Sequence, residues 1–167
     1  MTESQICNVL FLCTGNSARS ILAEALLNVL GRGRFHAYSA GSHPSGRVQP
    51  LAAELAERLG YPRDVLCSKP WDEFAAADAP SMDMIITVCD NAAGEACPVW
   101  PGHPAIAHWG VPDPAAVEGS EDERRRAYMD AMTTLRRRVE LLVALPPDKL
   151  ERLAAAHALR DIAERTA

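Results

Sequence analysis

Short apolar runs alternate with amphipathic helical patterns along this chain, and that alternation constrains its fold more than any other feature. The apolar runs that predict strands are 6–13, 35–41, 82–89 and 105–109. Helical spacing of apolar residues predicts helices at 18–30, 50–60, 120–145 and 148–165. Strands that alternate with helices pair in parallel and are covered on both faces. The pattern therefore predicts an α/β protein, a flavodoxin-like three-layer sandwich around a four-stranded parallel sheet.

The domain organisation follows from the length and from two prolines. The 167 residues suffice for one domain with a sizeable core. Pro146 and Pro147 interrupt the helical pattern, so we expect one main domain over 1–145 and a helical appendage over 146–167. The net charge of −5 argues against a general nucleic-acid binder.

The first residues indicate the compartment. They form no secretory signal, and no apolar run is long enough to span a membrane. We therefore expect a cytoplasmic protein without a membrane partner. Its five cysteines are then predicted to be thiols at rest.

The stretch FLCTGNSARS, residues 11–20, places a cysteine where the first strand gives way to a helix. Backbone N–H groups of such a loop converge on one point, and the helix dipole makes that point positive. The predicted oxyanion-binding residues are Thr14, Gly15, Asn16, Ser17, Ala18 and Ser20. Gly15 and Asn16 tolerate a positive φ, and the planar fork of Arg19 can grip two oxygens at once.

Cys13 lies at the base of this predicted anion site. A thiol beside a helix N-terminus and a guanidinium loses its proton more readily, so we expect a thiolate that Ser20 stabilises by a hydrogen bond. The residues then indicate a nucleophile facing a bound oxyanion. The alternative is a buried cysteine at a strand end with Arg19 on the surface.

The sequence CTGNSARS, residues 13–20, resembles the active-site loop of the low-molecular-weight protein tyrosine phosphatase superfamily, which includes arsenate reductases of that fold. The resemblance extends from about residue 6 to residue 144. It implies that Cys13 is the nucleophile, that residues 14–19 cradle the oxyanion and that Arg19 clamps the transition state. An Asp-Pro pair supplies the general acid in this family, and Asp113 matches it. The alternative for Asp113 is an ordinary turn aspartate.

Departures from the phosphatase branch favour a small inorganic substrate. That branch follows its Asp-Pro pair with aromatic residues, whereas Ala115 and Ala116 stand here. Thioredoxin-coupled arsenate reductases carry two further cysteines, which Cys89 and Cys97 resemble. The resemblance implies that Cys89 attacks Cys13 and that Cys97 then attacks Cys89.

Two departures concern the cysteines. The gap from Cys89 to Cys97 is one residue longer than in the best-known members, and Ala18 stands where many relatives have another cysteine. Relatives coupled to glutathione or mycothiol use an external thiol instead. We interpret Cys7 and Cys67 as buried structural thiols.

A metal site is the remaining alternative for these residues. Zinc ligands occur at Cys89, Cys97, His103 and His108, but their spacing is not that of a close cysteine pair. Glu24 matches a residue that holds potassium in some relatives, and the ammonium of Lys69 could replace that ion. We predict no metal.

Two arginine runs lie in the long helix predicted at 120–145. They are 124–126 and 136–138. Runs of like charge on a helix are usually its solvated face. We therefore expect both runs to face solvent.

The sequence thus predicts an arsenate reductase that depends on thiols. We expect no tightly bound cofactor, arsenate or phosphate as the bound oxyanion, and thioredoxin or glutathione with glutaredoxin as the electron donor. One alternative is a phosphatase, which needs Cys13, Arg19 and Asp113 but neither Cys89 nor Cys97. The other is a non-catalytic module that binds an oxyanion or zinc.

Overall fold

The computed structural model of the protein describes residues 6–89, 104–146 and 148–149. Its strands are β1 (Cys7–Cys13), β2 (Phe35–Gly41), β3 (Met84–Thr87) and β4 (Ala105–His108). Its helices are α1 (Arg19–Leu30), α2 (Pro50–Arg58), α3 (Asp72–Ala75) and α5 (Glu121–Val143), with single 3₁₀ turns η1 (Arg63–Val65) and η2 (Pro114–Ala116). The predicted α/β fold is confirmed.

The sheet has the strand order β2-β1-β3-β4, and every neighbouring pair is parallel. The register pairs Cys13 with Gly41 and Leu12 with Thr87, so the strands end at the same edge. In parallel sheets this carboxyl edge is where ligands bind. The sheet therefore brings the loops after β1, β2, β3 and β4 together.

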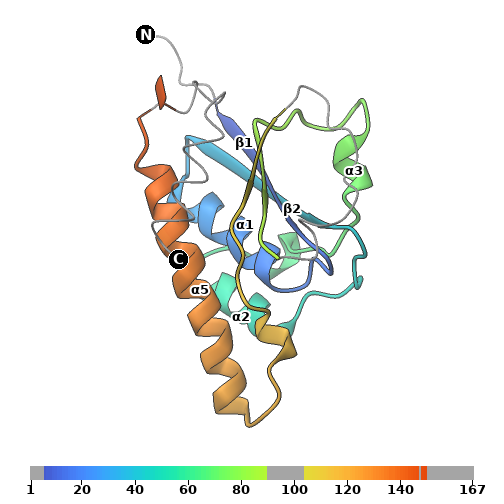
Figure 1. The fold of residues 1–167 in the computed structure, drawn as a ribbon, viewed down its shortest axis with the longest axis vertical. Coiled ribbons are helices and arrows are strands. Elements are labelled where there is room, and N and C mark those ends of the chain that lie inside the picture. Colours follow the sequence, from blue (N-terminus) through green and yellow to red (C-terminus); the bar gives the residue numbers. More distant parts are fainter. Residues whose placement is uncertain (1–5, 90–103, 147, 150–167) are drawn as a thin grey trace.

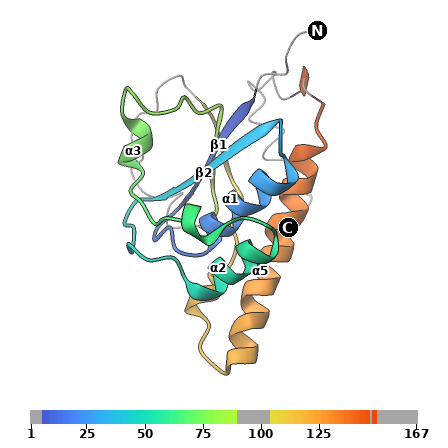
Figure 2. The same cartoon turned by 180° about the vertical axis from the view of Figure 1, so that it is seen from behind.

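Two apolar clusters pack on opposite faces of the sheet, and the views from both sides show this layering (Figures 1 and 2). The larger cluster lies under α1, α2 and α5 and includes Phe11, Leu26 and Leu135. The smaller one joins Leu10 to Phe74 of α3. Helix α3 has only four residues, too few for a periodic apolar pattern, so the sequence did not predict it.

The long helix α5 begins where the sequence predicts. The Ser120 hydroxyl accepts a hydrogen bond from the Glu123 N–H at 3.1 Å, which caps the helix N-terminus, and it donates to the Glu123 carboxylate at 3.3 Å. Its end is held by Arg34, whose guanidinium donates to the carbonyls of Val143 and Leu145, each at 2.7 Å. The helix predicted at 148–165 falls almost wholly outside the described residues.

The prediction that both arginine runs of α5 face solvent is wrong for one residue. Arg136 and Arg137 are exposed, but Arg138 is buried with only 5% of its surface accessible. Consecutive helical residues point about 100° apart, so a run of three arginines cannot keep all its members on one face.

No helix among the described residues is both long and apolar enough to cross a membrane.

Candidate active site

The loop after β1 is tied to its surroundings through its carbonyl groups. The carbonyl of Thr14 accepts from the His43 N–H, that of Gly15 from the Ser45 N–H, and that of Ser17 from the Gln49 N–H, at 2.9–3.0 Å. The side chain of Ser68 also donates to the Gly15 carbonyl, at 3.1 Å. These bonds turn the carbonyl oxygens of the loop outward, toward residues 43–49 and 68.

The N–H groups at the centre of the same loop differ from its carbonyl groups. No N–H from Asn16 to Ala18 donates to a backbone carbonyl within the described chain. The Gly15 N–H hydrogen-bonds to Cys13 and lowers the pKa of that thiol. A loop with bonded carbonyls and open N–H groups at a helix N-terminus is an anion cradle. The geometry fits the predicted role of residues 14–18.

Asn16 supplies the sharp bend of the loop. Its φ is 46°, the one positive φ at a non-glycine residue in the described chain, whereas Gly15 has no positive φ. The Asn16 side chain accepts from the Lys69 N–H at 2.8 Å and donates to the Ser20 hydroxyl at 2.9 Å. Asparagine adopts this conformation more readily than most residues because its short polar side chain bonds locally.

Cys13 and Cys89 lie side by side at the base of the cradle. Both are buried, and Cys89 is the neighbour that raises the pKa of Cys13 most. The Thr14 N–H donates to the Cys89 sulfur at 3.2 Å, and the Thr14 hydroxyl lies 3.5 Å from it. Both thiols are reduced. The parallel pairing of β1 with β3 therefore places a second thiol beside Cys13, the predicted nucleophile.

The protonation of Cys13 differs from the sequence-based expectation. The hydrogen bond with Cys89 and burial raise the pKa of Cys13, while Arg19 and the Gly15 N–H lower it. Among the described residues Ser20 forms no hydrogen bond to Cys13; its hydroxyl accepts from Asn16 instead. The two thiols titrate together as a pair, and the pKa of Cys13 is shifted upward, opposite to the expected direction.

Arg19 faces the cradle from the first residue of α1. Its Nη1 donates to the Val111 carbonyl at 2.9 Å, and its Nη2 lies 3.6 Å from the Asp113 carboxylate. Within the described chain, its Nε is the only buried side-chain nitrogen or oxygen without a hydrogen-bond partner. An orphaned buried donor costs free energy unless a ligand satisfies it. The guanidinium is therefore fixed by two groups and left with one donor for an anion.

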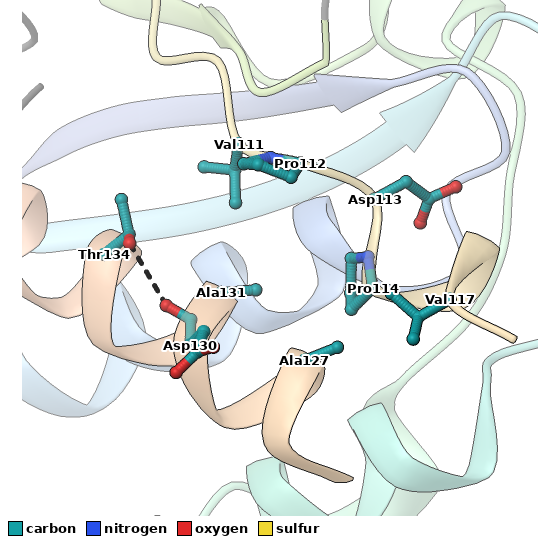
Figure 3. A pocket seen from close by; sticks show the side chains of 9 residues that line it. All are labelled: Val111, Pro112, Asp113, Pro114, Val117, Ala127, Asp130, Ala131 and Thr134. Atoms are coloured by element: carbon teal, nitrogen blue, oxygen red, sulfur yellow. Dashed lines mark hydrogen bonds between the residues drawn. The ribbon is translucent and has the colours of Figure 1, made fainter. Parts of the chain in front are cut away.

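Asp113 lies at the rim, on the segment that follows β4. Its Oδ1 accepts from the Ala115 N–H at 3.0 Å, and 40% of its side chain is exposed. A pocket of about 290 Å³ separates this segment from α5, and Figure 3 shows the Asp113 carboxylate directed away from Ala131 and Thr134 of that helix. The predicted acid thus stands beside Arg19, at the edge of a pocket that it helps to line.

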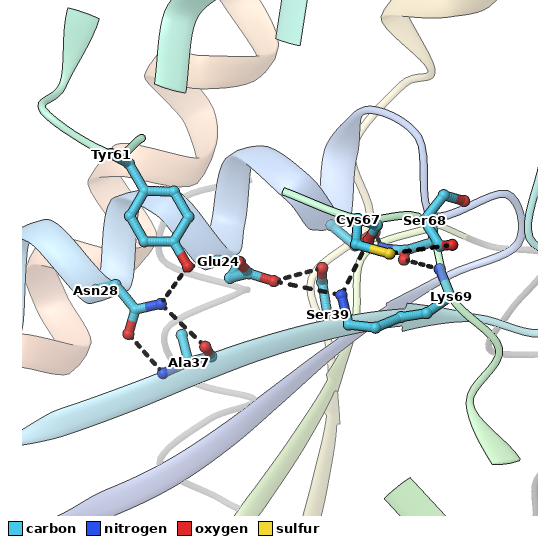
Figure 4. Close-up of polar contacts among 10 residues, drawn as sticks. Glu24, Asn28, Ala37, Ser39, Tyr61, Cys67, Ser68 and Lys69 are labelled. Atoms are coloured by element: carbon cyan, nitrogen blue, oxygen red, sulfur yellow. Dashed lines mark hydrogen bonds and ion pairs between the residues drawn. The ribbon is translucent and has the colours of Figure 1, made fainter. Parts of the chain in front are cut away.

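A buried polar network supports the cradle from behind (Figure 4). The Glu24 carboxylate accepts from the Ser39 hydroxyl at 2.7 Å and from the Tyr61 hydroxyl at 2.6 Å. The Lys69 ammonium lies 3.9 Å from Glu24 and donates to the Cys67 carbonyl at 2.9 Å. The network therefore holds a lysine next to the carboxylate, as the sequence suggested. It links α1 to the segment 67–69 that carries the Asn16 contact.

Three structural contributors to the site were missed by sequence reasoning. Gly41 packs against the loop, because a Cβ there would lie 2.5 Å from the Thr14 carbonyl. Residues 43–49 and 68–69 bond the loop from outside. A glycine at a strand end was the one available signal for such a close approach.

Other predicted residues have mixed outcomes. Cys7 is buried as expected, but Cys67 is exposed, so its interpretation as a buried thiol is wrong. Cys97 and His103 lie outside the described residues. Among those described, no three histidine, cysteine or carboxylate groups gather in a way that could hold a metal ion.

Comparison with known proteins matches residues 8–155 to the family model of the low molecular weight phosphotyrosine protein phosphatases. An arsenate reductase from Halalkalibacterium halodurans is 31% identical over 132 residues, which cover 79% of this chain and 91% of the relative.

Solved structures agree. One described as an arsenate reductase in the phosphate-binding state matches with a TM-score of 0.60 and 28% identity, over 83% of this chain and 98% of that chain. A thioredoxin-dependent arsenate reductase from Corynebacterium glutamicum shares the fold, with a TM-score of 0.57 and 24% identity, over 90% of this chain and 65% of that one. The chain belongs to the low molecular weight phosphotyrosine protein phosphatase family and is related, within it, to arsenate reductases.

Proposed function

We propose that this protein reduces arsenate to arsenite. The observation that carries the proposal is the position of Cys89 at the base of an anion cradle: its buried sulfur accepts from the N–H of Thr14, the residue after Cys13, at 3.2 Å. A phosphatase has no use for a second thiol at this place, whereas reduction of arsenic(V) requires two electrons. Two adjacent thiols supply them by forming one disulfide.

The first step is nucleophilic displacement at arsenic. Arsenate enters the cradle, where the open N–H groups of residues 16–18 and the unpartnered Arg19 Nε bind its oxygens. The Cys13 thiolate displaces one oxygen of the bound arsenate and forms a sulfur–arsenic(V) bond. Asp113, 3.6 Å from Arg19, gives a proton to the departing oxygen, which leaves as water.

The Cys13 proton must leave before this step. Burial and Cys89 hold the pKa of Cys13 up in the resting site, whereas Arg19 lowers it. The anion contacts the same guanidinium and N–H groups, so its own basic oxygens are the nearest acceptors for the proton. Arsenate then arrives as both the substrate and the base that activates Cys13.

The second step transfers the electrons. Cys89, as the thiolate, attacks the Cys13 sulfur and forms a sulfur–sulfur bond. The electron pair of the sulfur–arsenic bond stays with arsenic, which leaves as arsenite. The Thr14 N–H already donates to the Cys89 sulfur at 3.2 Å and would stabilise its thiolate.

The electron donor completes the cycle. A thiol reductant must reopen the disulfide, either thioredoxin or glutathione with glutaredoxin. Cys97, outside the described residues, is the proposed carrier of the disulfide toward that reductant.

The phosphatase alternative uses the same cradle, Arg19 and Asp113. The two residues that follow Pro114 are alanines, both exposed in η2, so no aromatic side chain stands there to hold an aryl ring. This observation favours the inorganic anion over phosphotyrosine.

The test is steady-state production of arsenite from arsenate, with thioredoxin, thioredoxin reductase and NADPH in one arm and glutathione with glutaredoxin in the other. Wild type should turn over in one arm, Cys13→Ser in neither. Cys89→Ser should lose the thioredoxin-coupled rate, and Cys67→Ser, at an exposed thiol, serves as the matched control. Hydrolysis of a phosphomonoester without arsenite production in either arm would replace the proposal with a phosphatase.

A further inference from the structure

The segment that carries Asp113 is held by the end of β3. The Trp109 N–H donates to the Thr87 carbonyl at 2.7 Å, and the Val111 N–H donates to the Val88 carbonyl at 3.1 Å. These bonds continue the strand pairing of β4 beyond its last residue. They fix one side of the segment beside the residue that precedes Cys89.

The same segment is held from two other sides by guanidinium groups. Arg19 Nη1 donates to the Val111 carbonyl at 2.9 Å, and Arg138 Nη1 donates to the Gly110 carbonyl at 3.0 Å. Gly110 is therefore bound from α5, and its neighbour Val111 is bound from α1. Asp113 follows Val111 by two residues and Gly110 by three, so both contacts lie close to it in the chain.

Side-chain packing holds part of this segment: Trp109 and Val111 are buried in the same core cluster as Leu135 of α5. The pocket of about 290 Å³ opens between the segment and α5 and is lined by Val111, Pro112 and Pro114 on one side and by Ala127 and Ala131 on the other (Figure 3). Gly110 itself has no side chain to pack, and the hydrogen bond from Arg138 joins its carbonyl to α5.

Burial of the Arg138 guanidinium beside Gly110 costs free energy. Only 5% of its surface is accessible, and burial lowers its pKa. Removing a guanidinium from water costs free energy that hydrogen bonds must offset. Arg136 and Arg137, its neighbours on α5, remain exposed.

We propose that Arg138 is a positioning residue for the arsenate reaction: its hydrogen bond to Gly110 fixes the segment that presents Asp113 to the anion and bonds Arg19. The inference rests on the proposed function. Arg138 contacts neither the cradle nor Cys13 in the described bonds and acts through the backbone of residues 110–113.

The experiment measures the loss of thiols in the reduced protein after arsenate is added without any external thiol. Arg138→Met keeps the length of the side chain and removes the donor. It should slow the arsenate-driven loss about tenfold, since a misplaced catalytic group costs rate steeply. Arg138→Lys, which retains one donor, should recover part of the rate. Arg137→Met, at the exposed neighbour, should react like wild type.

Two readouts separate positioning from general damage. Oxidation of the same thiols by diamide needs no acid, so its rate should be equal in wild type and Arg138→Met. In a double-mutant cycle, adding Arg138→Met to Asp113→Asn should slow the arsenate-driven thiol loss less than about threefold further, because the acid that Arg138 positions is already absent. If Arg138→Met does not fold, Arg138→Lys is carried through the same cycle, with a smaller but equally non-additive loss expected.

The outcomes distinguish this inference from the proposed function. Arsenate-driven thiol loss in wild type with an equal rate in Arg138→Met overturns the inference alone. The inference is also overturned if Arg138→Met slows thiol loss equally with arsenate and with diamide. Additive effects of Arg138→Met and Asp113→Asn on the arsenate-driven rate overturn it as well. No thiol loss in wild type overturns the proposed function itself.

Discussion

The packing of Gly41 against the active-site loop predicts a selective loss of anion binding. A Cβ at this position would lie 2.5 Å from the Thr14 carbonyl and 3.0 Å from the Asn16 N and Cβ atoms. In Gly41→Ala the loop must retreat by nearly 1 Å to restore ordinary contact, because these neighbours are backbone and a short side chain. Overpacking of this kind costs about 1–3 kcal/mol. That lowers the melting temperature by about 2–4 °C per kcal/mol in a chain of this size.

The same displacement moves the N–H groups that form the cradle. We expect the affinity of Gly41→Ala for inorganic phosphate, measured by calorimetry, to fall about tenfold or more, since electrostatic contacts depend steeply on placement. The matched control is Gly31→Ala, whose Cβ would lie 2.8 Å from the Phe35 ring and 2.9 Å from the Leu27 carbonyl, away from the cradle. It should lose stability but keep its phosphate affinity. Wild-type affinity in Gly41→Ala would refute the reasoning.

Three further predictions concern residues around the site. Arg34→Met removes the donors to the end of α5, so the free energy of unfolding in urea should fall by about 1–3 kcal/mol while arsenate-driven thiol loss stays at the wild-type rate; unchanged stability would contradict this. Tyr61→Phe removes a donor to the buried Glu24 and should cost a similar 1–3 kcal/mol, measured in the same way; a neutral effect would mean that the network does not depend on this hydroxyl. Burial raises the pKa of Cys7 from 9.0 to about 12, so its unfolded form loses the proton first, and stability should fall between pH 9 and pH 12 more in wild type than in Cys7→Ala; parallel curves would exclude Cys7 as the cause.

The sheet and its loop could be predicted because their signals are local. Residues 6–13 form an unbroken apolar run, and the helical period that begins at Ala18 follows within five residues. The carboxyl edge of a parallel sheet then fixes where Cys13, Cys89 and Asp113 must gather. The structure places these three on the ends or extensions of β1, β3 and β4 as that argument requires.

What the sequence could not predict depends on contacts between distant segments. The bonds of residues 43–49 to the loop involve backbone atoms, which leave no residue-type pattern. The burial of Arg138 depends on which face α5 turns toward Gly110. The pKa of Cys13 depends on a neighbour 76 positions away in the chain, and local arguments about the helix dipole and Arg19 therefore predicted the wrong direction.

The central claim is that Cys13 and Cys89 form one disulfide as arsenate is reduced, and one measurement tests it most directly. Reduced Cys97→Ser protein, in which the disulfide cannot pass to Cys97, is mixed with arsenate without external thiol, and its disulfides are mapped by mass spectrometry. The account predicts one Cys13–Cys89 bridge and one arsenite per chain, with Cys7 and Cys67 still reduced. Intact Cys13 and Cys89 thiols, or a bridge that omits either of them, would contradict it.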